Sequence, residues 1–568
     1  QAFPKNIIKH EREDLMDVQE SYSKIKGVSC IVYVQTCAAE KRRRRKRDQF
    51  PDPDQRIFIN TDVCEGCGDC GVQSNCVALT PVETEFGRKR AIDQSACNKD
   101  FSCVKGFCPS FVSLHGATPK KRLVRDFELP QMPSPVIEPI KGTYNIVVTG
   151  VGGTGVVTIG AVLAQAAQID GKGAGMMEMA GLAQKGGAVH IHCRLAETPQ
   201  DISAIRVATG ECDALIGGDL VVSSGAKTIG LTSSGRTGAV VNNHETVTGE
   251  FTRNAEFKIP QDQLLVVLQA RIKDRLSLFD ATELATELMG DSIFSNMMVF
   301  GAAWQQALVP VSHAAIFAAI ELNGAAVDKN KRAFELGRWA VLYPEKALEM
   351  TTPTVVGLPK SLEEKIKFRA EHLVRYQSRR LAKKYRKFLQ PIEDEQLKEA
   401  VAKGYHKLLA YKDEYEVARL HLKTRAMAEK HFDGVDSMSY HLAPPLFSKI
   451  GSDGRPKKRQ FGAIMDRGFT VLSKLKMLRG TPLDIFGYSS ERKMERNLIR
   501  QYEIDIPKLM PLLSKETKEI IISLAELPMT IRGFGPVKLI NEQKAAKRRE
   551  DLLQLLYYPE KTLDYAAE

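Results

Sequence analysis

Seven of the eleven cysteines lie within 45 residues, and this clustering restricts the fold more than any other feature of the sequence. They are Cys64, Cys67, Cys70, Cys76, Cys97, Cys103 and Cys108. Dense disulfide frameworks are typical of short secreted chains, whereas this chain has 568 residues, enough for about four domains. The clustering therefore predicts a metal site in a protein kept reduced, and we expect a cytoplasmic location.

Three of these cysteines are spaced two residues apart, in the run Cys64-x2-Cys67-x2-Cys70, with glycines interspersed. Such a run wraps one tight loop around a small inorganic core, and the bacterial ferredoxin run begins in the same way. Its remote ligand is typically a cysteine followed by proline, which Cys108-Pro109 supplies. The spacing predicts a [4Fe-4S] cluster held by these four cysteines. The alternative is a structural zinc site, which expects well-separated cysteine pairs.

The other three cysteines of the stretch, Cys76, Cys97 and Cys103, resemble the ligands of a second cluster. Two complete thiolate clusters need eight ligands, so a three-iron cluster, a non-cysteine fourth ligand or an eighth cysteine such as Cys37 would complete the set. The alternative is that these three are structural thiols. Because iron-sulfur clusters carry single electrons, the stretch indicates electron transfer or, less often, a structural role in a nucleic-acid enzyme.

A glycine-rich loop joins a predicted strand, residues 144–149, to a predicted helix, residues 156–168. In that context backbone amides and the helix N-terminus face an anion, which favours a phosphate-bearing ligand such as coenzyme A. The candidate contacts are Gly150, Gly152, Gly153, Thr154 and Gly155. A second glycine-dense loop adds Lys185, Gly186 and Gly187. A nicotinamide or flavin dinucleotide, with Asp170 as the acidic partner, and a purely structural turn remain alternatives.

The formal charge of +12 comes mainly from Lys41 to Arg47 and from residues 361–387, with the remainder close to neutral. Either block could contact nucleic acid, although a solvated face is the more common explanation. Residues 361–388 have helical periodicity, and Phe368, Tyr376, Tyr385 and Phe388 fall mostly on its apolar face, where core residues lie. We therefore expect no nucleic-acid partner.

Two stretches without formal charge, residues 144–169 and 292–320, are long enough to cross a membrane. Glycines interrupt the first stretch, and Gln305, Gln306, Pro310 and His313 interrupt the second. We therefore expect a chain that does not enter a membrane.

The motif Val63-Cys64-Glu65-Gly66-Cys67-Gly68-Asp69-Cys70-Gly71, with residues 84–90 and 97–100, resembles the ferredoxin module of the large fused indolepyruvate ferredoxin oxidoreductases. Thr36 to Glu40 and the basic run after it are similar to the end of that family's thiamine diphosphate domain. Residues 144 to about 340 resemble the gamma domain of 2-oxoacid ferredoxin oxidoreductases. Residues 440–445 and 479–484 are similar to the helical extension of the fused forms.

This resemblance implies an α/β multidomain chain with a ferredoxin-like iron-sulfur module, a Rossmann-like gamma domain and a mostly helical C-terminal domain. The expected parts are 1–48, the end of a thiamine diphosphate-type α/β domain; 49–118, the iron-sulfur module; 119–142, a linker; 143–350, the gamma domain; and 351–568, the helical extension. The first part is expected to contain a helix over 11–26 and a buried strand over 28–34.

The resemblance also implies an activity: oxidative decarboxylation of an aryl 2-oxoacid such as indolepyruvate to an arylacetyl-CoA and carbon dioxide. Thiamine diphosphate with Mg²⁺ would belong to a missing part or a partner subunit, coenzyme A would be a substrate, and a ferredoxin would accept the electrons. We expect a homo-oligomer and no catalytic residue in this chain alone. An electron-transfer subunit of another dehydrogenase and an iron-sulfur nucleic-acid-binding protein are the alternatives.

Overall fold

The computed structural model describes most of the chain as two compact units, Gln1–Asp52 and Pro53–Glu568. The described residues are 7–45, 47–120, 127–153, 155–180, 187–245, 249–254, 256–257, 259–351, 361–444, 448, 450–451 and 455–558.

The first unit contains two helices, α1 (Leu15–Ser23) and α2 (Ala38–Arg45), preceded by a 3-10 turn at Arg12–Asp14. The expected helix is therefore present, although shorter than predicted. The strand expected over residues 28–34 is wrong for this chain, because these residues form no strand and Val28, Val32 and Val34 are exposed. A strand needs a hydrogen-bonded neighbour, and none of the described residues supplies one.

The second unit contains a six-stranded mixed sheet in the order β11-β10-β9-β6-β8-β7. Its strands are β6 (Thr143–Val151), β7 (Gly173–Ala180), β8 (Ala188–Ala196), β9 (Ala214–Gly217), β10 (Gly238–Asn242) and β11 (Leu276–Phe279). Strands β6, β9, β10 and β11 pair in parallel, whereas β8 is antiparallel to β6 and β7. The predicted strand, glycine turn and helix at residues 144–168 correspond to β6 and α4 (Val156–Ile169), so this prediction is confirmed.

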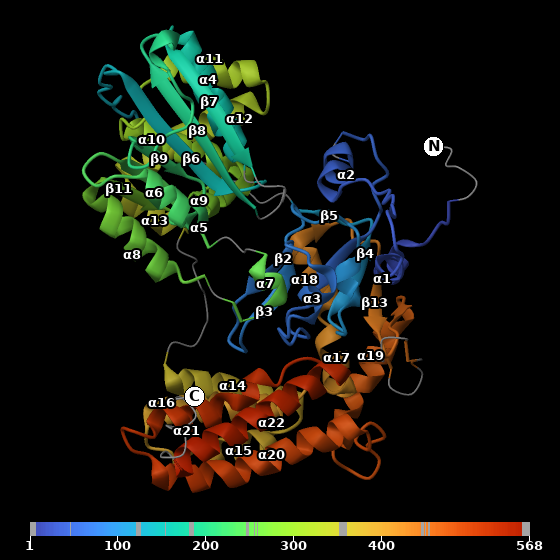
Figure 1. Ribbon diagram of the computed structural model, residues 1–568. Helices are drawn as coiled ribbons and strands as arrows, with labels where there is room; N and C mark the ends of the chain where they lie inside the picture. The colour runs from blue at the N-terminus through green and yellow to red at the C-terminus, as the bar shows by residue number, and fades with distance from the viewer. Residues whose placement is uncertain are drawn as a thin grey trace. The chain divides into compact units, whose positions relative to one another are not determined.

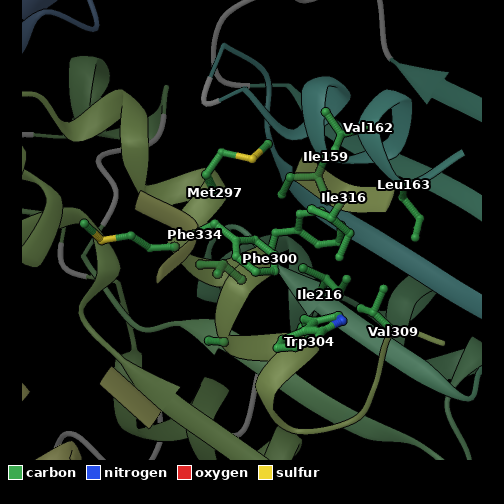
Figure 2. Close-up of a cluster of buried hydrophobic side chains, with 14 of the residues drawn as sticks. Ile159, Val162, Leu163, Ile216, Met297, Phe300, Trp304, Val309, Ile316 and Phe334 are labelled. Carbon is green, nitrogen blue, oxygen red and sulfur yellow. The ribbon is translucent and has the colours of Figure 1, made fainter. Parts of the chain in front are cut away.

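Helices cover both faces of this sheet (Figure 1). Alternate residues of its strands therefore point into two different hydrophobic cores. Val148 belongs to one core, with Phe300 and Phe334, and Val147 belongs to the other, with Leu268. Figure 2 shows the first core, where side chains from α4 and from three further helices interlock. The helices around the sheet are α5 (Leu220–Ser223), α6 (Ala226–Leu231), α8 (Gln261–Ile272), α9 (Ala281–Met289), α10 (Ser295–Gln305), α11 (His313–Asn323), α12 (Val327–Leu342) and α13 (Pro344–Thr351). Helix α7 (Glu250–Arg253) lies apart from them, against the cysteine-rich stretch (Figure 1).

The cysteine-rich stretch forms a small β structure completed by the C-terminal part of the chain. A four-stranded antiparallel sheet has the order β1-β4-β13-β14. Its strands are β1 (Arg56–Ile59), β4 (Phe111–His115), β13 (Ser437–Leu442) and β14 (Arg459–Phe461). Helix α3 (Asp69–Ser74), the hairpin β2 (Leu79–Val82) with β3 (Lys89–Ile92), a 3-10 turn at Ser102–Lys105, and the pair β5 (Thr118–Pro119) with β12 (Phe432–Asp433) complete it.

The C-terminal part is mainly helical, as predicted (Figure 1). Its helices are α14 (Leu362–Tyr376), α15 (Arg379–Leu389), α16 (Glu395–Leu409), α17 (Glu414–His421), α18 (Thr424–His431), α19 (Ile464–Lys474), α20 (Ser490–Leu509), α21 (Lys518–Glu526) and α22 (Gly535–Tyr557). Tyr376 and Tyr385 are fully buried, and Phe388 lies against Tyr405 with ring centroids 4.4 Å apart. These aromatic rings therefore belong to the core of the helices and form no exposed platform for stacking bases.

Among the described residues, no helix combines the length and the apolar composition needed to cross a membrane. The two uncharged stretches of the sequence instead include elements of the mixed sheet and its core, such as β6, α4 and α10.

Candidate functional site

The loop carrying Cys64, Cys67 and Cys70 is shaped by glycines in the left-handed region. Gly66 and Gly68 have φ of 70° and 80°, and a Cβ on Gly66 would collide with the backbone carbonyl of Arg88. The loop starts from buried Asn60, whose backbone carbonyl accepts from Cys64 N at 2.9 Å. The sequence therefore folds into a tight loop at the position predicted for the inorganic core.

Cys108 is brought to this loop by Asp69, which is buried. The Asp69 carboxylate accepts from the backbone N–H of Phe107 at 2.6 Å, and Arg455 pairs with the same carboxylate at 3.0 Å. Gly106 allows the approach, because a Cβ there would lie 2.7 Å from the Cα of Cys70. The remote cysteine thus lies against the three local ones.

The thiols of Cys64, Cys67, Cys70 and Cys108 are near enough to interact electrostatically with one another. Burial, reinforced by the neighbouring thiols, raises the pKa of Cys67 and Cys70, and it raises the pKa of Cys108 to about 11. Cys67, Cys70 and Cys108 are therefore neutral thiols by themselves. A bound metal reverses this preference, because coordination deprotonates a thiol.

Cys76, Cys97 and Cys103 form a separate group, again defined by mutual electrostatic interaction. Burial, followed by the effect of Cys76 and Cys97, raises the pKa of the Cys103 thiol to about 12. Asp100 is the carboxylate that interacts with Cys103. The proposed eighth cysteine, Cys37, belongs to the other compact unit, where it is exposed.

The first thiol group fits an iron-sulfur cluster in its donor type, burial and hydrogen bonds. Gly66 N donates to Cys64 Sγ at 3.3 Å, and Ser110 Oγ lies 3.0 Å from Cys108 Sγ. Among the described residues, no three His, Cys, Asp or Glu side chains converge tightly enough to hold one metal ion. A four-iron cluster asks for a wider arrangement, because each thiolate binds a different iron atom.

Two cations accompany the thiols, one half-buried and one buried. Lys458 Nζ donates to the carbonyl of Gly106 at 2.5 Å and interacts electrostatically with both Cys108 and Cys103. Arg90 is 2% exposed, interacts with Cys70 and Cys64, and lies over the ring of Phe251 at 3.8 Å. Positive charge at these positions offsets the negative charge of a thiolate-bound cluster.

The helical extension supplies much of the wall around the first thiol group, which the sequence did not reveal. Lys407 and Lys412 both pair with buried Glu65, the residue after Cys64, and the second pair measures 2.9 Å. His421 Nε2 donates to the carbonyl of Pro109 at 3.0 Å, and Phe534 joins the buried cluster around the cysteines. Pro109 and His421 are 312 positions apart in the sequence. No local sequence pattern predicts contacts between residues that are so far apart.

The two predicted glycine loops meet each other: Gly152 N donates to the carbonyl of Gly187 at 2.7 Å. Gly150 lies within β6, and Gly153 has φ of 98°. Gly155 begins α4, and its carbonyl accepts from Asn296 Nδ2 at 3.1 Å. Thr154, Lys185 and Gly186 lie outside the described residues.

Asp170, the acidic residue considered for a dinucleotide, ends α4 and accepts from Ser312 N and Oγ at 2.5 and 2.6 Å. Its carboxylate therefore ties α4 to α11. Cys193 and Cys212 are buried at 1% and 0% exposure, so these two thiols fill the core around the sheet.

Asp219 was missed as a neighbour of the glycine loop. It follows β9, is fully buried, and accepts from Val222 N at 2.8 Å as the cap of α5. Next to it, Gly218 N donates to the carbonyl of Thr149 at 2.7 Å. The position of Asp219 directly after a parallel strand could have indicated it, because ligand-binding groups of α/β folds lie at the carboxyl ends of such strands.

Comparison with known proteins assigns the mixed-sheet domain. Residues 145–340 match the family model described as pyruvate ferredoxin/flavodoxin oxidoreductase. Indolepyruvate oxidoreductase subunit IorB of Thermococcus kodakarensis is 29% identical over 197 residues, which cover 34% of this chain and 94% of that relative. The corresponding subunit of Pyrococcus horikoshii is 28% identical over the same share of each chain. Residues 145–340 therefore form a domain of the 2-oxoacid:ferredoxin oxidoreductase superfamily.

Among solved structures of this superfamily, the gamma subunit of a keto/oxoacid ferredoxin oxidoreductase from Geobacter sulfurreducens matches with a TM-score of 0.26 and 23% identity. The match covers 35% of this chain and 98% of that subunit. Residues 362–551 match a second family model, described as a family of unknown function.

Proposed function

We propose that this chain is the electron-transfer and gamma-domain part of an oxidoreductase that decarboxylates aryl 2-oxoacids, with indolepyruvate as the substrate class. The substrate class is supported by relatives that match 197 residues of this chain and are named indolepyruvate oxidoreductase subunits. The observation that carries the electron-transfer role is the grouping of Cys64, Cys67, Cys70 and Cys108 around one loop.

In this proposal those four thiolates hold a [4Fe-4S] cluster, and Cys76, Cys97 and Cys103 hold a second iron-sulfur cluster. Asp100 is the candidate fourth ligand of the second cluster, since its carboxylate interacts with Cys103. A bound iron-sulfur cluster accepts and passes on one electron at a time. The chain's own residues position the thiolates, exclude water through the cluster of Ile57, Phe111 and Phe534, and supply compensating positive charge from Lys458.

The carbon chemistry belongs to thiamine diphosphate with Mg²⁺, bound by another part of the protein or by another subunit, and coenzyme A is the acyl acceptor. We assign the joined loops at Gly152 and Gly187 to the coenzyme A phosphates, with Gly150, Gly153, Thr154, Gly155, Lys185 and Gly186 as further contacts. A ferredoxin is the proposed electron acceptor.

The test is the iron and acid-labile sulfide content of the anaerobically purified chain, together with EPR of its reduced form. Cys108→Ser is expected to lose the iron and the signal of one four-iron cluster. Cys193→Ser is the matched control, because Cys193 is a buried thiol outside both groups and should keep the full iron content. An iron-free protein loaded with zinc, or a Cys108→Ser variant with unchanged iron, would overturn the assignment.

Substrate class is tested separately with the chain joined to its thiamine-binding part. Indolepyruvate should bleach the visible absorption of the clusters when coenzyme A is present. Bleaching by pyruvate or 2-oxoglutarate, with none by indolepyruvate, would refute the aryl substrate class and leave the cluster assignment standing.

A further inference from the structure

A cavity of about 250 Å³ lies between the loop that follows Cys64, the hairpin β2–β3 and helices α14, α16 and α17. Its wall is strongly basic, with eight lysine and arginine side chains against four carboxylates. Neither family model covers the cysteine-module side of this wall, which includes Glu65 and Lys89.

Three of the four carboxylates are already neutralised. Glu65 pairs with Lys407 and Lys412, and Glu85 pairs with Arg369 at 2.6 Å. Glu416 pairs with Arg419, also at 2.6 Å. The excess positive charge therefore lies on basic side chains that have no carboxylate of their own.

Lys89 is the most constrained of these cations. It lies in β3, is only 5% exposed and lines the cavity. In the part of the chain that the structure describes, its ammonium group makes no ion pair and no hydrogen bond. Burial and the neighbouring cations Lys412 and Lys407 disfavour its charged form more than Glu65 favours it, so an anion inside the cavity would stabilise the ammonium group.

Two further cations face the same cavity from other elements. Arg375 comes from α14, and Lys423 comes from the turn between α17 and α18. Both are exposed, and neither has an ion pair within the described residues. Three cations converging from three elements suit an anion with several charged oxygens pointing in different directions, which is the geometry of a phosphate group.

We propose that this cavity binds a small multivalent phosphate-type anion, such as pyrophosphate or the polyphosphate of a nucleotide. Lys89 contacts it from the buried end, and Arg375 and Lys423 contact it from the rim. The proposal does not depend on the electron-transfer role, since binding is measured directly and needs no turnover.

The experiment is calorimetric titration of the full chain with pyrophosphate at constant ionic strength. One saturable site is expected. Lys89→Met keeps the length of the side chain, removes the charge, and should weaken binding by about tenfold or more, the size of a lost charge-assisted hydrogen bond. The matched control is Lys383→Met, which removes the same charge from an exposed site on α15 outside the cavity wall and should bind as the unaltered chain does.

The proposal is overturned if pyrophosphate shows no saturable binding at constant ionic strength, or if folded Lys89→Met binds as tightly as the unaltered chain. If Lys89→Met loses cooperative unfolding, the exposed Lys423→Met variant decides: weaker binding supports the site, and unchanged binding refutes it. Titrations with ATP and coenzyme A identify the source of the phosphate. Succinate binding as tightly as pyrophosphate would refute the phosphate class.

Discussion

The carboxylate of Asp69 and the backbone N–H of Phe107 form a 2.6 Å hydrogen bond that joins the first cysteine loop to the residue before Cys108. This hydrogen bond connects the loop of Cys64, Cys67 and Cys70 to the segment that carries Cys108, the fourth proposed ligand. A carboxylate acceptor makes the bond stronger than one between neutral groups.

Asp69→Ala should therefore loosen Cys108 and speed the loss of iron to a chelator by about tenfold, from the loss of a charge-assisted hydrogen bond. The measurement is the rate at which visible absorption decays in anaerobic protein mixed with a ferrous chelator. Asp62→Ala, two residues before Cys64 and exposed, should release iron at the normal rate. Equal rates for the two variants would show that the Asp69 bond does not hold the site together.

Lys458 should set the reduction potential of the proposed first cluster. Its ammonium group interacts electrostatically with Cys108 and Cys103, and a nearby positive charge stabilises the more negative, reduced state. Lys458→Met should lower the midpoint potential by on the order of 50 mV, the scale of one partly screened charge at such a range. Redox titration followed by EPR measures it. Lys457→Met is the control, because it removes the exposed charge of the preceding residue. An equal shift of the midpoint potential in both variants would contradict a specific role for Lys458.

Two glycines allow α10 and α12 to touch. A Cβ on Gly301 would collide with the carbonyl of Phe334, and a Cβ on Gly337 would collide with that of Met298. Gly301→Ala should lower the free energy of unfolding of this domain by about 1–3 kcal/mol or more, as overpacking does. Both tryptophans, Trp304 and Trp339, belong to these helices, so their fluorescence in urea reports the domain selectively.

Gly230→Ala is the control for that substitution. Gly230 lies in α6 with open space where a Cβ would be built, so alanine should be neutral or stabilising there by up to about 1 kcal/mol. Similar losses in both variants would mean that helix contact is not the cause.

The neighbouring imidazoles of half-buried His372 and buried His406 should make the helical extension sensitive to acid. Nδ1 of His372 and Nε2 of His406 lie 3.1 Å apart. Burial lowers the pKa of His372 from 6.5 to about 4, although Glu416 opposes the shift, and burial lowers that of His406 well below its usual value. Between pH 6.5 and 4 the unfolded chain binds more protons at His372 than the folded chain does.

Stability should therefore fall as the pH drops through this range, by up to about 3 kcal/mol from His372, and His372 should add nothing more below it. His372→Leu should flatten that part of the dependence. Urea unfolding followed by circular dichroism at several pH values measures the difference between the two proteins. A constant difference across the range would refute the role of His372.

The sequence predicts the local features of this protein well. The spacing around Cys64 places three thiols on one loop because glycines 66 and 68 permit the required backbone, and that relationship lies within seven residues. The alternation of Val147 and Val148 between two cores follows from the pleat of a strand. The strand expected over residues 28–34 fails because a strand depends on a neighbour that periodicity does not report.

The long-range contacts could not be predicted. Nothing near Glu65 indicates that Lys407 and Lys412 neutralise it, and Tyr440 carries no sign that its strand pairs with Val112. Lys458 is one of two adjacent lysines in the basic stretch 455–459, and only the fold distinguishes it from Lys457. Electrostatic partners of this kind depend on the tertiary arrangement, which a single sequence does not encode in any short pattern.

Contacts between the cysteine-rich stretch and the C-terminal part, such as the pairing of β4 with β13, form only after both partners have been synthesised. Asn60 hydrogen-bonds to Leu420, 360 positions further along the chain, so the ribosome needs roughly 20–70 s to make the second half of this contact at ordinary elongation rates. Throughout that interval the nascent cysteine loops lack their final cover. For the proposed clusters, this interval is the stage of synthesis at which iron and sulfide meet the least covered cysteine loops.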